Sequence, residues 1–166
     1  MKNIFFASVI IFFAFLSCRD DDRIVQNIDQ IVTIYMDSAG QDMLNSNISG
    51  SYTNISFNDV NGLTDTAPVS LSNRKDIDTV NFLEYVAGAR RILIDSSDVN
   101  AKIYESKIDF TFTKKVTDTT NTTFTETLTL NYVLKPEVFR IEKAFYNGNL
   151  VFTKVDGEPN IIKIEK

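Results

Sequence analysis

The chain has 166 residues, one cysteine, and 22 acidic against 17 basic residues, which gives a net charge of −5. It contains neither histidine nor tryptophan. Hydrolase triads with a histidine base and zinc sites with histidine ligands are therefore excluded. The acidic balance argues against a nucleic-acid partner because it repels phosphate backbones, and a single cysteine allows no intramolecular disulfide.

The first segment in chain order is an apolar N-terminus. Lys2 precedes an almost unbroken apolar run, Ile4 to Ser17, and Cys18 follows directly. This run is shorter than the roughly 20 residues that a membrane-spanning helix needs. Its layout is typical of a cleaved secretory signal, so we predict a signal peptide over residues 1–17. The alternative is an ordinary secretory signal in which the cysteine has no role.

The residues around the predicted cleavage point add a resemblance. Leu16-Ser17-Cys18 resembles the end of a bacterial lipobox. The resemblance implies cleavage before Cys18 and acylation of its thiol and its new amino group, and several acyl chains would hold the mature chain on a membrane.

An acidic cluster follows the cysteine. Asp20, Asp21 and Asp22 are similar to the export signal of surface lipoproteins in the Bacteroidetes. This resemblance implies a lipid-anchored protein of the outer membrane that faces the cell surface. The alternative is that residues 18–27 form a solvated acidic tether that only keeps the domain away from the headgroups.

Residues 28–166 are predicted to form one domain of β-strands. Apolar residues lie on both faces of the first strand, with Ile28, Val32, Ile34 and Met36 on one and Ile31 and Tyr35 on the other. We therefore expect this strand inside a sheet. Residues 37–51 are rich in turn formers, and a loop this long is expected to have a role or local structure. Shorter strands are predicted at 52–58, around 69–71, and at 80–85 and 92–94.

The clearest pattern is a pair of long strands at 104–113 and 123–134. In both, most even positions carry apolar side chains, whereas most odd positions carry polar or hydroxyl ones. This period predicts an antiparallel hairpin with one face on a core and the other in water. A strand at 139–145 then reaches Asn147-Gly148, a strong two-residue hairpin turn, and strands at 150–155 and 161–164 complete the domain.

Eight to ten strands at this spacing favour an all-β fold, an antiparallel immunoglobulin-like β-sandwich, with a small β-barrel as the alternative. Residues 37–45 and 143–151 look like elements of uncharacterised Bacteroidetes lipoproteins with one β-sandwich domain. That resemblance implies a location and a fold but no biochemical activity.

Carboxylates are the remaining candidates for catalysis. Glu84, Glu105 and Glu126 are candidates for a glycosidase, which needs two carboxylates that flank a cleft. The strand pattern predicts a solvent-facing position for each of them, so we predict no enzyme. Two loops could offer oxygen ligands to a cation, Asp37 with Asp42 and Asn45, and Asp59 with Asn61 and Asp65. Aspartates that stabilise turns are the favoured explanation, and we predict no metal or cofactor.

Two further expectations concern the surface. Ser38, Thr66, Thr79 and Thr119 each follow an aspartate, and these positions are similar to sites at which Bacteroidetes attach O-glycans to exported proteins. We expect a binding or interaction module for a protein or a glycan, with an exposed aromatic patch formed by Tyr35, Tyr52 or Tyr146. A structural or assembly lipoprotein facing the periplasm is the alternative, and it needs no such patch.

Overall fold

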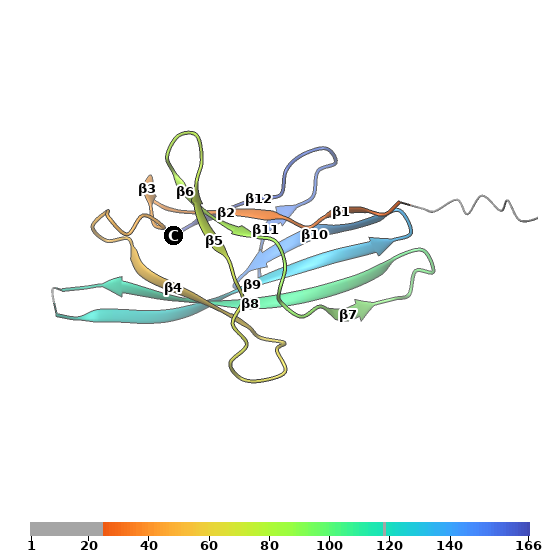
Figure 1. Ribbon diagram of the computed structural model, residues 1–166, viewed down its shortest axis with the longest axis horizontal. Helices are drawn as coiled ribbons and strands as arrows, with labels where there is room; N and C mark the ends of the chain where they lie inside the picture. The colour runs from red at the N-terminus through yellow and green to blue at the C-terminus, as the bar shows by residue number, and fades with distance from the viewer. Residues whose placement is uncertain (1–24, 118) are drawn as a thin grey trace, which may run out of the picture.

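The computed structural model describes residues 25–117 and 119–166, and within them the chain forms twelve strands in two sheets and no helix (Figure 1). The predicted signal peptide, Cys18 and the aspartates at 20–22 lie outside the described residues. In the part that is described, no helix is long and apolar enough to cross a membrane.

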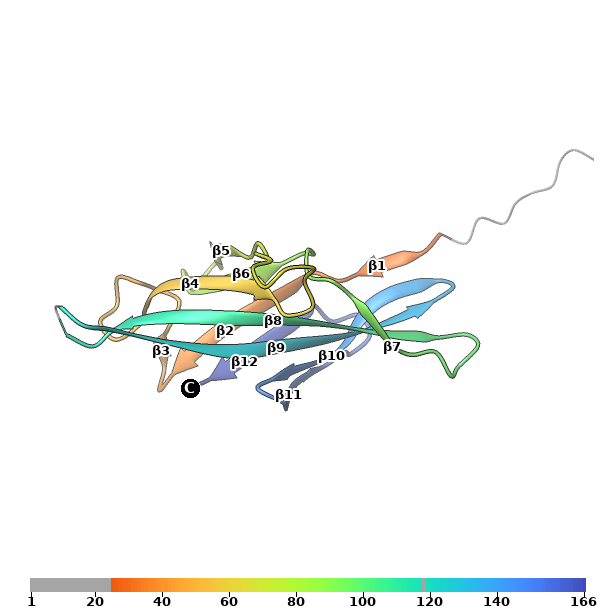
Figure 2. The same cartoon turned by 90° about the horizontal axis from the view of Figure 1, so that it is seen from below.

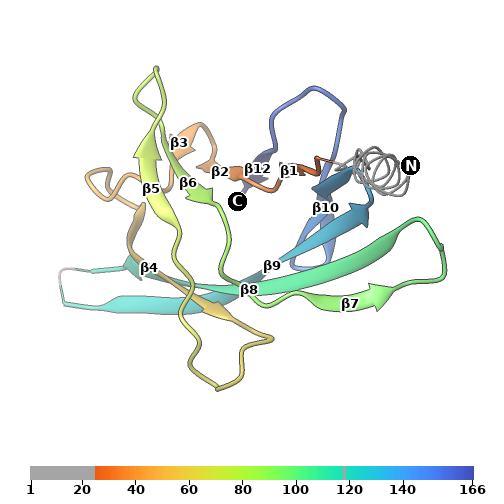
Figure 3. The ribbon, with the colours of Figure 1, turned by 45° about the vertical axis from the view of Figure 1, so that its right-hand side comes forward.

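The larger sheet is built on three long antiparallel strands, β8 (Lys102–Lys115), β9 (Asn121–Lys135) and β10 (Val138–Tyr146). Figure 2 shows β8 and β9 running along most of the molecule. Four shorter strands pair with their outer edges: β4 (Tyr52–Asp59) and β7 (Ile92–Asp95) pair with β8, and β1 (Asn27–Asp29) and β11 (Asn149–Thr153) pair with β10. The sheet curls like half a barrel (Figure 3).

The smaller sheet has the order β12 (Ile161–Glu165), β2 (Val32–Ser38), β6 (Asn81–Tyr85) and β5 (Ser72–Lys75), and β3 (Gln41–Asp42) also pairs with β2. The expectation of purely antiparallel pairing is wrong at two places, because β12 pairs with β2 and β1 pairs with β10 in parallel. The chain leaves the larger sheet after β1 and enters the smaller one as β2, and the last strand returns beside β2 in the same direction.

The core lies between the inner faces of the two sheets. The predicted long hairpin is confirmed, since Ile108, Phe110 and Phe112 of β8 and Leu128 and Leu130 of β9 have no exposed surface. Opposite them, the smaller sheet contributes alternate residues of β2, β6 and β12, namely Val32, Ile34, Met36, Leu83, Tyr85, Ile162 and Ile164. The two-residue period of a strand thus separates a buried face from an outer one in both sheets.

The first predicted strand is divided between the two sheets. β2 does lie inside its sheet, between β12 and β6. However, Ile28 belongs to β1 in the other sheet and is 61% exposed, and Ile31, at the point where the chain changes sheets, is 52% exposed. The outer-face residues of β2 itself, Thr33, Tyr35 and Asp37, are half-buried, so this face is only partly covered and Tyr35 keeps some exposed surface.

The long loop after β2 has local structure, as expected. Gln41 and Asp42 pair with β2 as β3, and the side chains of Met43 and Leu44 are buried in the core. The Asn147-Gly148 turn is also confirmed: both residues have positive φ, 48° and 80°, and Tyr146 pairs directly with Asn149. Positive φ at both central positions is the conformation of a type I′ turn, one of the two types that close two-residue hairpins.

Candidate functional site

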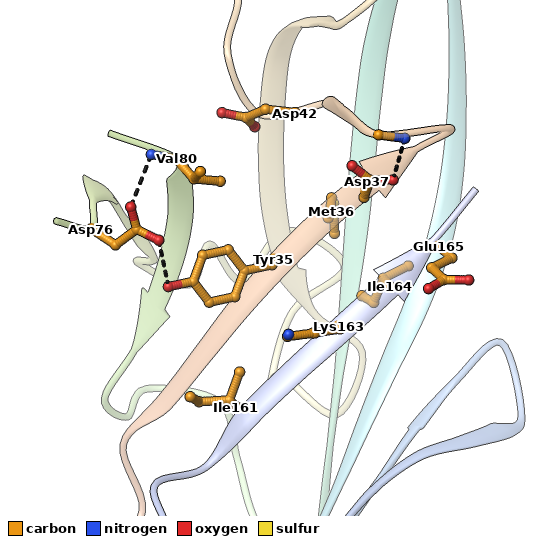
Figure 4. Close-up of a pocket in the computed structure, with 11 residues that line it drawn as sticks. Tyr35, Met36, Asp37, Asp42, Asp76, Val80, Ile161, Lys163, Ile164 and Glu165 are labelled. Atoms are coloured by element: carbon orange, nitrogen blue, oxygen red, sulfur yellow. Dashed lines mark hydrogen bonds between the residues drawn. The ribbon is translucent and has the colours of Figure 1, made fainter. Parts of the chain in front are cut away.

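The outer face of the smaller sheet carries a hollow of about 530 Å³ between β2, β12 and the β5–β6 turn (Figure 4). Its lining combines an aromatic ring, aliphatic side chains, four carboxylates and one ammonium group. The residues whose side chains the site uses are Tyr35, Asp37, Asp42, Asp76, Val80, Ile161, Lys163 and Glu165.

The register of β2 and β12 positions the centre of this hollow. The two strands are parallel, and the pairing sets Tyr35 beside Lys163 and Asp37 beside Glu165. The residues between them, Met36 on β2 and Ile164 on β12, point inward and are buried. The alternation that builds the core therefore also presents these four side chains together on the outer face.

The ring of Tyr35 is held in place from two sides. Its hydroxyl donates a hydrogen bond to Asp76 Oδ2 at 3.1 Å, and its ring centroid lies 5.7 Å from that of Phe82. Burial, and then the hydrogen bond and negative charge of Asp76, raise the pKa of Tyr35 above its usual value. Tyr35 is therefore a neutral, oriented aromatic side chain at any physiological pH.

Asp76 is itself fixed by the β5–β6 turn. Its Oδ1 accepts the backbone N–H groups of Asp78 and Val80 at 3.0 and 2.9 Å. An aspartate that accepts N–H groups further along the chain is a common way to stabilise a turn. Among the described residues, Asp76 thus holds the turn through Oδ1 and Tyr35 through Oδ2.

Two other carboxylates of the lining are also bonded to the protein. Asp42 Oδ2 accepts the backbone N–H and the side-chain amide of Asn81 at 2.9 and 2.7 Å, and its Oδ1 accepts Leu44 N–H. Asp37 Oδ1 accepts the N–H of Gly40 at 2.8 Å. Gly40 has a φ of 81°, a conformation that glycine adopts without strain, so this turn depends on it.

Lys163 and Glu165 differ from these bonded residues. Neither side chain forms a hydrogen bond or an ion pair with another residue in the described ranges 25–117 and 119–166. Glu165 also stands next to Asp37 across the β2–β12 pair, and like charges in facing positions destabilise a sheet. The fold therefore leaves charged groups available at the rim of the hollow.

The two loops considered as cation sites use their aspartates in turns. Asp37 and Asp42 accept the bonds described above, and Asp59 accepts the N–H groups of Asn61 and Arg90 at 2.9 and 2.6 Å. Asn45 accepts the N–H of Asn47, and Asp65 is exposed. Among the described residues, no group of three or more acidic or cysteine side chains is placed to hold a metal ion.

The three glutamates considered for catalysis lie far apart in the fold. Glu84 pairs with Arg74 in the smaller sheet, and Glu105 pairs with Lys107 on the outer face of the larger sheet, both at 2.9 Å. The expectation that Glu126 faces solvent is wrong. Its even position in β9 places it on the core face with Phe124 and Leu128, and it accepts hydrogen bonds there from Tyr146 at 2.5 Å and from Lys166.

Burial and hydrogen bonding shift the pKa of Glu126 in opposite directions. Burial alone would raise the pKa of Glu126, but the bonds from Lys166 and Tyr146 outweigh it and hold the pKa below its usual value. The Lys166 ammonium also lies 4.6 Å from the centroid of the Tyr146 ring. Glu126 is thus an ionised member of a closed cluster with Tyr146 and Lys166.

The expected exposed aromatic patch is wrong for two of its three tyrosines. Tyr52 is 4% and Tyr146 is 6% exposed. Tyr52 packs on Phe112 at a centroid distance of 4.4 Å, and Tyr146 is bonded to Glu126. Of the three tyrosines, only Tyr35 keeps appreciable exposed surface, and it is half-buried.

The four positions similar to O-glycosylation sites occupy different environments. Thr66, Thr79 and Thr119 lie in exposed turns or loops. Ser38 is half-buried at the end of β2, where its hydroxyl donates a hydrogen bond to the backbone oxygen of Lys166 at 3.1 Å. A glycan needs an exposed attachment site, so the three threonines are more accessible to this modification than Ser38.

No family model, curated protein or solved structure that was compared with the chain matches it. Sequence reasoning named Tyr35, Asp37 and Asp42 but missed Asp76, Lys163 and Glu165. The alternation of Ile161-Ile162-Lys163-Ile164-Glu165 could have indicated that Lys163 and Glu165 share an outer face, but only the pairing of β12 with β2 places them beside Tyr35.

Proposed function

We propose that this protein is a non-catalytic binding module, held on the outer membrane by acyl chains at Cys18 and exported to the cell surface through Asp20, Asp21 and Asp22. The hollow on the smaller sheet is its ligand site. We also propose that the two sheets form a sandwich of the immunoglobulin-like kind, which the alternation of buried residues in both sheets supports.

The observation that carries the proposal is the combination of bonded and unbonded groups in the hollow. Binding sites commonly join an apolar or aromatic surface to a few polar groups that converge on it. Tyr35 is fixed by Asp76 and Phe82, whereas the side chains of Lys163 and Glu165 have no partner among the described residues. A site that keeps its aromatic side chain rigid and its charged groups free suits the capture of a ligand.

The arrangement of carboxylates supports binding more than glycoside hydrolysis. Four carboxylates line the hollow, which is the convergence a glycosidase would need. Asp42 and Asp76 are each bonded to at least two N–H groups, however. The remaining pair, Asp37 and Glu165, stands side by side on neighbouring strands, so the two cannot flank a glycosidic bond from opposite sides.

The position of the hollow supports an outward-facing site. β1, the strand nearest to Cys18 in the sequence, lies toward one end of the molecule, and the C-terminus after β12 lies away from it (Figure 1). The hollow is formed by the second half of β2 and by β12, on the C-terminal side of that arrangement. A module anchored through residue 18 would thus present the hollow away from the bilayer.

Protease treatment of intact cells tests this proposal. We expect the wild-type protein to fractionate with the outer membrane and to be digested on intact cells, because the domain faces outward. The Cys18→Ala variant should leave the membrane fraction. Full protection from protease on intact cells would contradict the surface location and favour the structural or assembly lipoprotein of the periplasm, and an unacylated wild-type Cys18 would contradict the anchor.

A further inference from the structure

We infer that the hollow binds a carbohydrate, and that the sugar against Tyr35 is neutral or amine-bearing rather than acidic. This inference rests on the proposed binding function and names the class of ligand for the same site. Three features of the hollow support it: the fixed aromatic ring, the free polar groups beside that ring, and the charge of the lining.

The aromatic ring provides the apolar half of a sugar site. A pyranose has a face of C–H groups that packs against an aromatic ring, and tyrosine offers such a ring with little conformational freedom to lose. Tyr35 is already held by its bond to Asp76 and its contact with Phe82, so a ligand would not have to order it. Val80 and Ile161, each 39% exposed, extend the apolar surface beside it.

The groups next to the ring provide the polar half. Sugar hydroxyls both donate and accept hydrogen bonds, so a site for them needs both kinds of partner. The Lys163 ammonium can donate, and the carboxylates of Glu165 and Asp37 can accept. The strand register places all three on the same outer face as Tyr35. Hydrogen bonds to charged groups are stronger than those between neutral groups. This added strength offsets the weaker binding expected in a hollow that is open to water.

The charge of the lining selects among sugars. Four carboxylates, those of Asp37, Asp42, Asp76 and Glu165, surround the hollow, and Lys163 is its one cationic lining residue within the described chain. The carboxylate of a uronic acid would be repelled by these four carboxylates. A neutral sugar hydroxyl would not be repelled, and the ammonium group of an amino sugar would be attracted. We therefore expect discrimination against acidic glycans.

The test uses the full-length acylated protein in detergent micelles and three oligosaccharides of matched length, made of glucose, glucosamine and galacturonic acid. Binding is measured by isothermal titration calorimetry. We expect the glucose or the glucosamine oligomer to bind, and the galacturonic acid oligomer to bind about tenfold more weakly or not at all.

Variants locate the binding in the hollow. Tyr35→Ala should weaken the binding of the preferred oligomer by about tenfold, whereas Tyr35→Phe, which keeps the ring, should stay within about threefold of wild type. Glu165→Gln should also weaken binding, and Glu158→Gln, an exposed glutamate outside the lining, serves as its matched control. Circular dichroism confirms that each variant is folded.

Three results would overturn the inference. They are the absence of binding by all three oligomers, equal or tighter binding of the galacturonic acid oligomer, and wild-type affinity of Tyr35→Ala. If no oligomer binds but a crosslinker attached at Lys163 joins the protein to a polypeptide on intact cells, the carbohydrate inference fails while the binding function stands. Failure of surface exposure or of acylation would instead contradict the proposed function.

Discussion

Two polar clusters in this protein look alike in composition but differ in how many of their groups are bonded. One is the hollow around Tyr35, where Lys163 and Glu165 have no side-chain partner among the described residues. The other lies where β1 and β2 meet the loop before β12, and it contains Lys154, Asp29 and Asn160.

In the second cluster nearly every polar group has a partner. The Lys154 ammonium, on a side chain that is 4% exposed, contacts Asp29 Oδ2 and the Glu158 backbone oxygen at 2.6 Å each and Asn160 Oδ1 at 3.0 Å. Asn160 in turn donates to Asp29 Oδ1 at 2.7 Å and to the Ile31 backbone oxygen at 2.9 Å. The network joins the place where the chain changes sheets to the approach to β12.

The number of bonded groups distinguishes a polar cluster that stabilises the fold from one that binds a ligand. Buried polar groups stabilise a fold only when they are bonded, since an unbonded buried group carries a desolvation cost. At an open surface, water bonds the free groups until a ligand replaces it. We therefore expect changes around Lys154 to affect stability and changes around Lys163 to affect binding.

The largest effect is expected for Lys154→Met. This change keeps most of the length of the side chain but leaves Asp29, Asn160 and the Glu158 carbonyl without their shared donor. Asp29 is 37% exposed, so water replaces part of the lost ion pair, but Asn160 is buried and loses a charged donor. The free energy of unfolding should therefore fall by about 2 to 3 kcal/mol in urea denaturation. Lys135→Met, at an exposed lysine, should change it by less than about 0.5 kcal/mol. Equal stability of the two variants would show that the network is not structural.

Two tyrosine variants compare the loss of a hydroxyl in the core with the same loss in the hollow. Tyr146→Phe and Tyr35→Phe each remove one hydroxyl that donates to a carboxylate, at 2.5 Å in the core and at 3.1 Å in the hollow. Tyr146→Phe leaves Glu126 partly buried with one bond fewer, so it should cost about 2 kcal/mol of unfolding free energy. Tyr35→Phe should cost about 0.5 kcal/mol, because water can take the place of its hydroxyl. A similar loss in both variants, measured in urea, would contradict the distinction.

The pH dependence of stability provides a smaller effect. Burial opposes ionisation of Asp29 and Glu126, but their hydrogen bonds and ion pairs hold both pKa values below the ordinary 3.8 and 4.5. A carboxylate with a lowered folded-state pKa stabilises the protein above its unfolded pKa and loses that contribution as the pH falls through the folded value.

The urea midpoint should therefore be constant near neutrality and fall as the pH drops below about 4.5. The Glu126→Gln variant titrates one carboxylate fewer, so its midpoint should fall less steeply over the same range. A wild-type midpoint that rises on acidification, or a Glu126→Gln slope equal to that of wild type, would contradict the role of these bonds.

The smallest effect, and one of opposite sign, is expected for Glu165→Gln. The change removes one of two like charges that face each other across β2 and β12, so the protein should gain about 0.3 kcal/mol of unfolding free energy. The gain should disappear in high salt, which screens exposed charges. Any loss of stability above about 0.5 kcal/mol would show that Glu165 has a structural role in the hollow.

The amphipathic strands were the part of the fold most readily predicted. The even-position pattern of 104–134 correctly placed the buried face of β8 and β9, since burial of alternate residues is a property of each strand alone. The same rule, applied consistently, would have assigned Glu126 to the inner face. β5 was missed because its residues, Ser72–Lys75, are polar and all exposed at a sheet edge, so they show no alternation.

The candidate site was only partly predictable. Tyr35 could be recognised as an aromatic side chain on the second face of β2, but Tyr52 and Tyr146 could not be distinguished from it by sequence alone. Their burial depends on contacts with other strands, through Phe112 for Tyr52 and through Glu126 for Tyr146. Asp76 joined the site only because the β5–β6 turn folds over the outer face of β2.

Local features could be predicted from the chain alone: the charge and the single cysteine, the strands with a buried and an outer face, and the Asn147-Gly148 turn. The complete fold was needed to show that β12 lies parallel to β2, that β1 and β2 belong to different sheets, and that Lys163 and Glu165 stand beside Tyr35 and Asp37. The physical reason is that alternation and turn conformation depend on neighbouring residues, whereas the choice and register of partner strands depend on how all the buried faces close around one core.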